Sequence, residues 1–269
     1  MSESLNRPDA RWCDPVGLIL QATLRDFLRR KDLYVVALLM GIFLIGALAV
    51  RVIGVDSPDA AHFLVSAGLT LSGILAAILA AAFASRALPE EFERRTILPL
   101  LAKPLSRGQV IAGKLSAALG IAIPSYLAFV LVVMLSAPGI GHQSLISLIQ
   151  VVALQIIAIA ILAMGSMLLS LFWPTVLAAL AALFWFFASD FVINTVLSIF
   201  KQKESLLWSA VGRLLYLLPN MGLLSHTELY ASGNDPMALS SFLVLVLYGL
   251  VWVAALFALT NWLFNRKKF

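Results

Sequence analysis

Apolar residues in this chain fall into six long stretches separated by polar connections. Each stretch reaches the roughly 20 mostly apolar residues that a helix needs to cross the hydrocarbon of a bilayer. We expect helices because the stretches are too long and too uniformly apolar for barrel strands, and because lipid cannot pair free backbone groups. The predicted spans are residues 33–53, 59–84, 108–136, 144–171, 175–200 and 238–264.

Several boundaries have sequence signals of their own. Pro58, between a capping serine and an aspartate, suits the first turn of the second span. Trp173-Pro174 separates the fourth and fifth spans with almost no loop. Before the first span, the apolar residues of 15–31 recur at helical spacing, with charged residues on much of the other side. This pattern is typical of an amphipathic helix lying flat on the membrane. That segment could also simply extend the first span.

Composition supports the same class. Apolar residues make up 61% of the 269 residues, only 12% are charged, and the mean hydropathy is +0.97, far from the balance of a soluble domain. The single cysteine, Cys13, excludes a disulfide framework and a thiolate zinc cluster. We therefore predict an all-α polytopic membrane protein, with a cytoplasmic N-terminal part (1–32), one six-helix transmembrane domain (33–264) and a short tail (265–269).

The basic residues give the expected orientation. With six spans, fifteen of the 19 Lys and Arg residues fall on one side of the membrane, in the N-terminal part, the second connection and the tail. The other side keeps Arg51, Lys201, Lys203 and Arg213. Because Lys and Arg concentrate in cytoplasmic loops, both termini are expected in the cytoplasm.

The second span contains a face of small residues. Gly68, Ser72, Ala76, Ala80 and Ala84 recur every four residues and therefore share one side of a helix. Small residues let helices approach closely in lipid. This face is expected either to pack against other helices of the same chain, or to meet a cavity or a second subunit.

The connection at residues 86–114 is the charge-dense internal segment. Acidic residues follow Pro89 and favour a helix start, and an apolar run then extends from Ile97 to Leu101 before Pro104 ends it. A short amphipathic helix of this kind suits docking into a groove of another protein. A merely solvated loop is the alternative, but it would not need the leucines.

This connection resembles the signature of the permease subunits of bacterial ABC exporters, the type-2 ABC permeases. The resemblance rests on the order Glu90-Glu91, Arg94, Thr96, Leu100-Leu101, Pro104, Ser106-Arg107 and Gly113-Lys114. Family members usually have glycine where this chain has Arg95. The span pattern resembles the six-span branch without large soluble domains, which includes the permease of nitrous-oxide reductase maturation.

The resemblance implies that residues 89–104 are a coupling helix on a separate ATPase. It implies two ATPase subunits, which bind ATP and Mg²⁺, and a second permease subunit, identical or related, in the bacterial inner membrane. Membrane lipid is a further expected partner, nucleic acid is not, and this chain is expected to hold no cofactor. The residues expected to contact the ATPase are Glu90, Glu91, Arg94, Arg95, Thr96, Ile97, Leu100, Leu101, Pro104 and Arg107.

One motif is misleading. Residues 108–114 match the first seven positions of a phosphate-binding loop, but Leu115 stands where a Ser or Thr would hold magnesium, and no strand precedes it. We therefore expect no ATPase site in this chain, and Lys114 is interpreted as an anchor at the cytoplasmic interface.

Asp190 is the acid deepest inside a predicted span. A carboxylate there costs roughly 2.5–3.5 kcal/mol, so it should face protein or water. Asn194 follows one turn later and is close enough along the helix to share a hydrogen bond. Both are candidates for the substrate pathway. The alternative is a protonated Asp190 that bonds neighbouring helices, and the aromatic residues at 184–187 are expected mainly to pack.

The fifth connection, residues 201–237, is long and is predicted to lie outside as an interfacial or re-entrant segment. It would serve as an outer gate or as a simple anchor. His62, His142 and His226 map to the same outer face without short spacing, so no metal site is expected.

Two other classes compete with a transport subunit driven by ATP. A secondary carrier would usually have more spans or broken helices with paired ionisable groups. A membrane-embedded enzyme would need an acid pair, a Ser–His pair or a metal cluster in a buried cavity, and no such set lies within the predicted spans.

Overall fold

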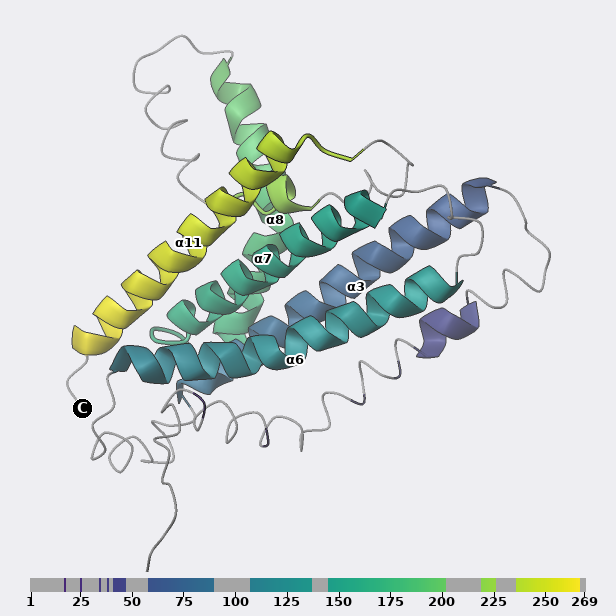
Figure 1. The fold of residues 1–269 in the computed structure, drawn as a ribbon. Helices are drawn as coiled ribbons and strands as arrows, with labels where there is room; N and C mark the ends of the chain where they lie inside the picture. The colour runs from purple at the N-terminus through teal and green to yellow at the C-terminus, as the bar shows by residue number, and fades with distance from the viewer. Residues whose placement is uncertain are drawn as a thin grey trace, which may run out of the picture.

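The computed structural model describes residues 41–46, 58–89, 107–136, 145–201, 219–225 and 236–266, and the single positions 17, 25, 34 and 38. Within these ranges the chain is helical and has no strand (Figure 1). The elements are α3 (Pro58–Ala87), α6 (Arg107–Ser136), α7 (Leu145–Leu169), α8 (Thr175–Lys201), the short 3-10 helix η1 (Gly222–Leu224) and α11 (Leu239–Arg266).

The long helices follow the predicted spans. Each begins within one residue of its predicted start and ends within three residues of its predicted end. Four of them, α3, α6, α7 and α11, are long and apolar enough to cross a membrane, and Thr175–Ser189 of α8 forms a shorter apolar stretch. The predicted class of an all-helical, multi-pass membrane protein is therefore confirmed. A total of six spans stays a prediction, since of the first span only positions 34, 38 and 41–46, all helical, are described.

Local sequence explains two of the helix boundaries. α3 begins at Pro58, whose fixed φ and missing N–H suit a first helical position. Trp173 and Pro174 lie in the turn between α7 and α8, where Trp173 N–H donates to Leu169 O at 3.0 Å. α8 begins directly after this proline, which cannot continue the preceding helix.

The small-residue face of α3 lies inside the chain. Ser72, Ala76, Ala80 and Ala84 are each at most 1% exposed. A Cβ added at Gly68 would lie 2.6 Å from Val133 Cγ2 on α6, so glycine allows the two helices to approach closely there. Of the two expectations for this face, packing within the chain is the one that the structure bears out.

A second face of α3 packs against α7 and α8. Ala77 and Ala81 form a buried cluster with Leu162 of α7 and Ala182 of α8. Because three of these four side chains are alanines, the backbones of the three helices can pack closely. α3 thus contacts α6, α7 and α8, while α7 contacts all the other helices described here, α11 included.

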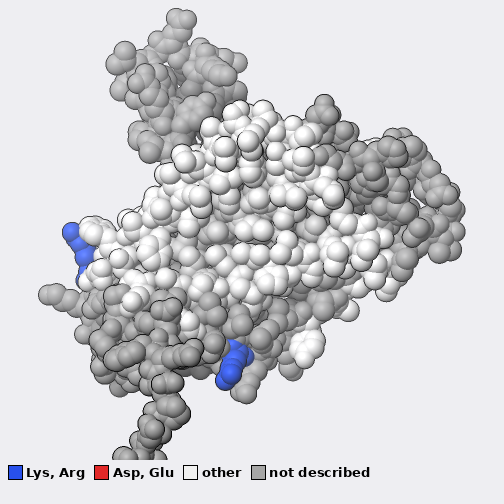
Figure 2. All heavy atoms as spheres, in the orientation of Figure 1, with Lys and Arg blue, Asp and Glu red and all other residues white. Residues whose placement is uncertain are grey.

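The outer surface is apolar over most of the bundle. Figure 2 shows one face, on which the described residues carry no charge except at its lower and left edges. α11 has many exposed apolar side chains, including Leu243, Val244, Leu247 and Val251, each more than half exposed. Such a surface suits lipid or a protein partner, not water.

Basic side chains gather at one end of the bundle. Arg86 lies in the last turn of α3, Lys114 lies about two turns into α6, and Arg266 is the last residue of α11. The Arg266 guanidinium lies 3.9 Å from the ring centroid of Trp262, which is a cation–π contact typical of a membrane interface. Figure 1 shows these three helix ends close together.

Candidate functional site

The predicted coupling residues lie largely outside the described part of the chain. This applies to Glu90, Glu91, Arg94, Arg95, Thr96, Ile97, Leu100, Leu101 and Pro104, whereas Arg107 is the first residue of α6. The helices on either side are described. Leu88, after α3, and Ile111, in the first turns of α6, belong to one buried cluster, so the connection starts and ends at the same end of the bundle.

Asp190 and Asn194 lie in the second half of α8. The structure describes their backbone as helical, while their side chains lie outside the described part. Their predicted role in a substrate pathway therefore stays a prediction. The residues just before them do form part of a site.

A short segment, Pro219–Ser225, which contains the 3-10 helix η1, packs against the middle of α8. Trp185 Nε1 donates to Pro219 O at 3.2 Å, and Met221 N–H donates to the hydroxyl of Ser189 at 3.1 Å. Ser189 lies 14 residues after the start of α8, which is about 21 Å along the helix. The segment is therefore far from the helix end.

The same segment is held from the side of α11. Asn220 N–H donates to the hydroxyl of Tyr248 at 3.0 Å, and Asn220 Oδ1 accepts from Gly222 N–H at 2.9 Å. Irregular backbone inside an apolar bundle is tolerated when protein groups pair its N–H and C=O groups. Side chains of α8 and α11 supply such pairs here.

Gln150 of α7 fixes the chain ahead of α11. Its Nε2 donates to Met237 O, and its Oε1 accepts from Met237 N–H, both at 3.0 Å. The amide is 94% buried but both its functional groups are paired. Gln150 therefore has a structural role, as a clamp on the residue two positions before α11.

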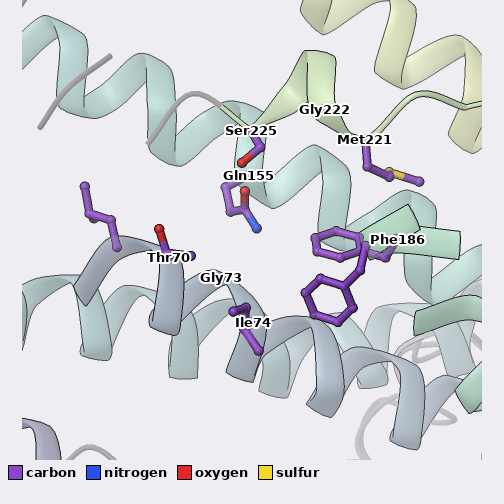
Figure 3. Close-up of a pocket in the computed structure, with 10 residues that line it drawn as sticks. Thr70, Gly73, Ile74, Gln155, Phe186, Met221, Gly222 and Ser225 are labelled. Carbon is purple, nitrogen blue, oxygen red and sulfur yellow. The ribbon is translucent and has the colours of Figure 1, made fainter. Parts of the chain in front are cut away.

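A half-open cavity of about 420 Å³ lies where α3, α7, α8 and the Pro219–Ser225 segment meet (Figure 3). Thr70, Gln155 and Ser225 contribute polar groups on one side. Phe186 and Met221 lie on the other side. The side chains that the structure describes around this cavity include none with a charge.

Gln155 is the central polar group of the cavity. It is 96% buried, and Figure 3 shows its amide extending from α7 toward Gly73 of α3. A Cβ at Gly73 would lie 2.7 Å from Gln155 Nε2, so glycine makes room for the amide. Among the described residues the structure gives this amide no hydrogen-bond partner, in contrast to Gln150.

The aromatic residues of α8 divide between two roles. Trp185 packs in the buried cluster of α7, α11 and η1 and anchors Pro219. Phe186 and Phe187 line the cavity, with ring centroids 5.3 Å apart and planes at 90°. Trp185 therefore packs as expected, and Phe186 both packs in the same cluster and lines the cavity with Phe187.

Sequence reasoning missed Gln155 because it started from the acid Asp190 and considered only the polar neighbour on the same helix, Asn194. The signal was present, since Gln150 and Gln155 are the two amides in the otherwise strongly apolar α7. An amide in a span must find partners in protein or water. What the sequence does not show is that one glutamine is paired and the other is not.

Two minor candidates also have an outcome. Residues 108–115 are helical, so the stretch that resembles a phosphate-binding loop does not form a loop. His62 lies near the start of α3, and the other two histidines lie outside the described residues. In the described part of the chain no three metal-ligating side chains come together.

The sequence was also compared with known proteins. Curated proteins give no match. The sequence profile of the ABC-2 family transporter proteins matches residues 19–269, which is almost the whole chain and includes every helix described above. Proteins of this family are membrane permeases that normally work with an ABC ATPase partner. The chain therefore belongs to the ABC-2 transporter family and is a multi-pass permease subunit of an ABC transporter.

Proposed function

We propose that this permease works as an exporter driven by ATP, in which two copies of a separate ATPase bind ATP and Mg²⁺ and a second permease, identical or related, completes the pathway. The family match over residues 19–269 is the observation that supports this most strongly. A secondary carrier remains the competing function, and it would need no ATPase.

The basic end of the bundle supports an orientation in which this end faces the cytoplasm. Arg86, Lys114 and Arg266 lie there, and Lys and Arg concentrate on the cytoplasmic side of bacterial inner-membrane proteins. In this orientation both termini and the connection between α3 and α6 lie in the cytoplasm, where an ATPase can reach them. The Pro219–Ser225 segment then enters from the outer side.

α3 provides the mechanical route from the ATPase to the cavity. The chain continues from the end of α3 into the proposed coupling helix, and Gly73 in the middle of α3 lines the cavity. Its faces toward α6 and toward α7 and α8 are closely packed around small residues. Because packed helices move as rigid bodies, a push on residues 89–104 shifts the wall of the cavity.

Asp190 and Asn194 belong to the proposed pathway through their place on α8. They follow the cavity-lining Phe187 by one and two turns of the same helix. A displacement of α8 that widens the cavity therefore also moves both residues.

Charge reversal at the coupling helix tests this function. A variant with Glu90→Lys and Glu91→Lys should recover at least tenfold less ATPase when the permease is purified from cells, because like charges at a docking site cost several kcal/mol. Glu204→Lys with Glu228→Lys makes the same charge change in the fifth connection and should leave recovery unchanged. Equal recovery in both variants would place the ATPase contact elsewhere, and transport without an ATPase would favour the secondary carrier.

A further inference from the structure

We infer that the cavity between α3, α7, α8 and the Pro219–Ser225 segment binds an uncharged amphipathic molecule with an aromatic body and an amide group. This inference rests on the proposed function in one respect only, namely that the bound molecule is the cargo of the transporter. The binding itself follows from the residues of the cavity.

The first argument is the unpaired amide of Gln155. An amide in an apolar bundle needs hydrogen-bond partners from protein, from water or from a ligand. Gln155 is 96% buried as a residue, and no hydrogen bond joins it to the described residues, but its amide is not among their fully enclosed unpaired groups and therefore opens onto the cavity. Gln150, five residues earlier on the same helix, is equally buried and has both functional groups paired. An amide offers donors and an acceptor, so a ligand amide can pair with both.

The second argument is the division of the cavity into a polar and an apolar side. The hydroxyls of Thr70 and Ser225 lie on the same side as Gln155 in Figure 3, and Phe186 and Met221 lie opposite. A ligand that spans the cavity therefore needs a hydrogen-bonding group at one end and a flat or flexible apolar group at the other. Aromatic rings pack well against phenylalanine edges and methionine sulfur.

The third argument concerns charge and size. The described side chains that line the cavity include no cation or anion, so a charged ligand would lose its hydration without gaining a counter-charge from them. A volume of about 420 Å³ lies within the range of small-molecule sites. These properties favour an uncharged molecule of small to medium size.

The wall of the cavity that carries Gln155 has space for its amide beside Gly73. Gly73 lets Gln155 Nε2 come to within 2.7 Å of where a Cβ would lie. On the far side of the cavity, the backbone N–H of Met221 donates a hydrogen bond to the hydroxyl of Ser189. The apolar wall is therefore held by a hydrogen bond, and the polar wall has room for the amide beside Gly73.

A single-cysteine reporter tests the site on the purified permease without ATP. Cys13 is the one natural cysteine, so Cys13→Ser with Ser225→Cys places a sole thiol at the cavity. Alkylation by N-ethylmaleimide is timed with benzanilide, an uncharged aromatic amide, or with trans-stilbene, a hydrocarbon of the same shape. Benzanilide should bind about tenfold more tightly than stilbene, as judged by protection of the thiol, because only it can pair with Gln155.

Two further variants make the result specific. Gln155→Met should remove the advantage of benzanilide over stilbene, since it keeps the shape of the side chain without its amide. Gln150→Met, the matched control, should keep that advantage in the folded protein. Equal protection by the two compounds, or an advantage that persists in Gln155→Met, would overturn the inference. Since the assay uses no ATPase, a negative result would not bear on the proposed function. Conversely, a permease that binds benzanilide but copurifies with no ATPase would count against the proposed function alone.

Discussion

Gln150 and Gln155 are two buried glutamines of one helix in opposite surroundings. Gln150 pairs with both backbone groups of Met237 at 3.0 Å, whereas Gln155 points at a cavity without a partner in the described part of the chain. Burial alone therefore does not separate a structural amide from one available to a ligand. The pairing of its donor and acceptor does.

The largest expected difference between the two regions is in stability. Gln150→Leu should lower the free energy of unfolding by about 2–3 kcal/mol, because it leaves the N–H and C=O of Met237 unpaired. Gln155→Leu should leave it unchanged or raise it, since no hydrogen bond is lost. Unfolding by heat or SDS in detergent measures both. Equal losses in the two variants would show that Gln155 is paired in the folded protein.

Two glycines sharpen the same comparison. A Cβ at Gly249 of α11 would overlap the Ile157 side chain, so Gly249→Ala should cost about 1–2 kcal/mol through overpacking near η1. At Gly73 the added Cβ meets the end of the Gln155 side chain, which can turn into the cavity. Gly73→Ala should therefore be neutral in a thermal unfolding assay. A loss as large as that at Gly249 would mean that the amide cannot move.

A smaller effect is expected where α8 holds the Pro219–Ser225 segment. Ser189→Ala removes the acceptor of Met221 N–H and should cost about 1 kcal/mol. Ser166→Ala is the matched control, because Ser166 is equally buried and its hydroxyl donates to Ala163 O within its own helix. That bond competes with a helical one, so its loss should be nearly neutral. Indistinguishable unfolding midpoints would show that Ser189 does not anchor the segment.

The sequence was sufficient for the helices but not for the cavity. Long apolar runs and a proline such as Pro58 are local features, and the helices follow them closely. The cavity instead joins Gly73, Gln155, Phe186 and Ser225, which lie on four separate segments. No periodicity within one span predicts which faces of different spans meet, because packing between distant segments decides it.

The position of Pro219–Ser225 was out of reach for a related reason. Its backbone groups pair with side chains about 30 residues away, on α8 and α11. Sequence pattern predicted an interfacial or re-entrant segment over 201–237, without its partners. Trp185 and Tyr248 resemble ordinary aromatic residues of an apolar span until their hydrogen bonds are known.

The turn between α7 and α8 limits how this protein can change shape. Five residues, 170–174, separate the two helices, and Phe172 and Trp173 both donate backbone hydrogen bonds to Leu169 O. So short a connection holds these two helix ends together. α7 and α8 can therefore separate only by rotating about the turn, as about a hinge. Any increase in the distance between them must therefore be greatest at the start of α7 and the end of α8, so the two helices can open toward one side of the membrane only.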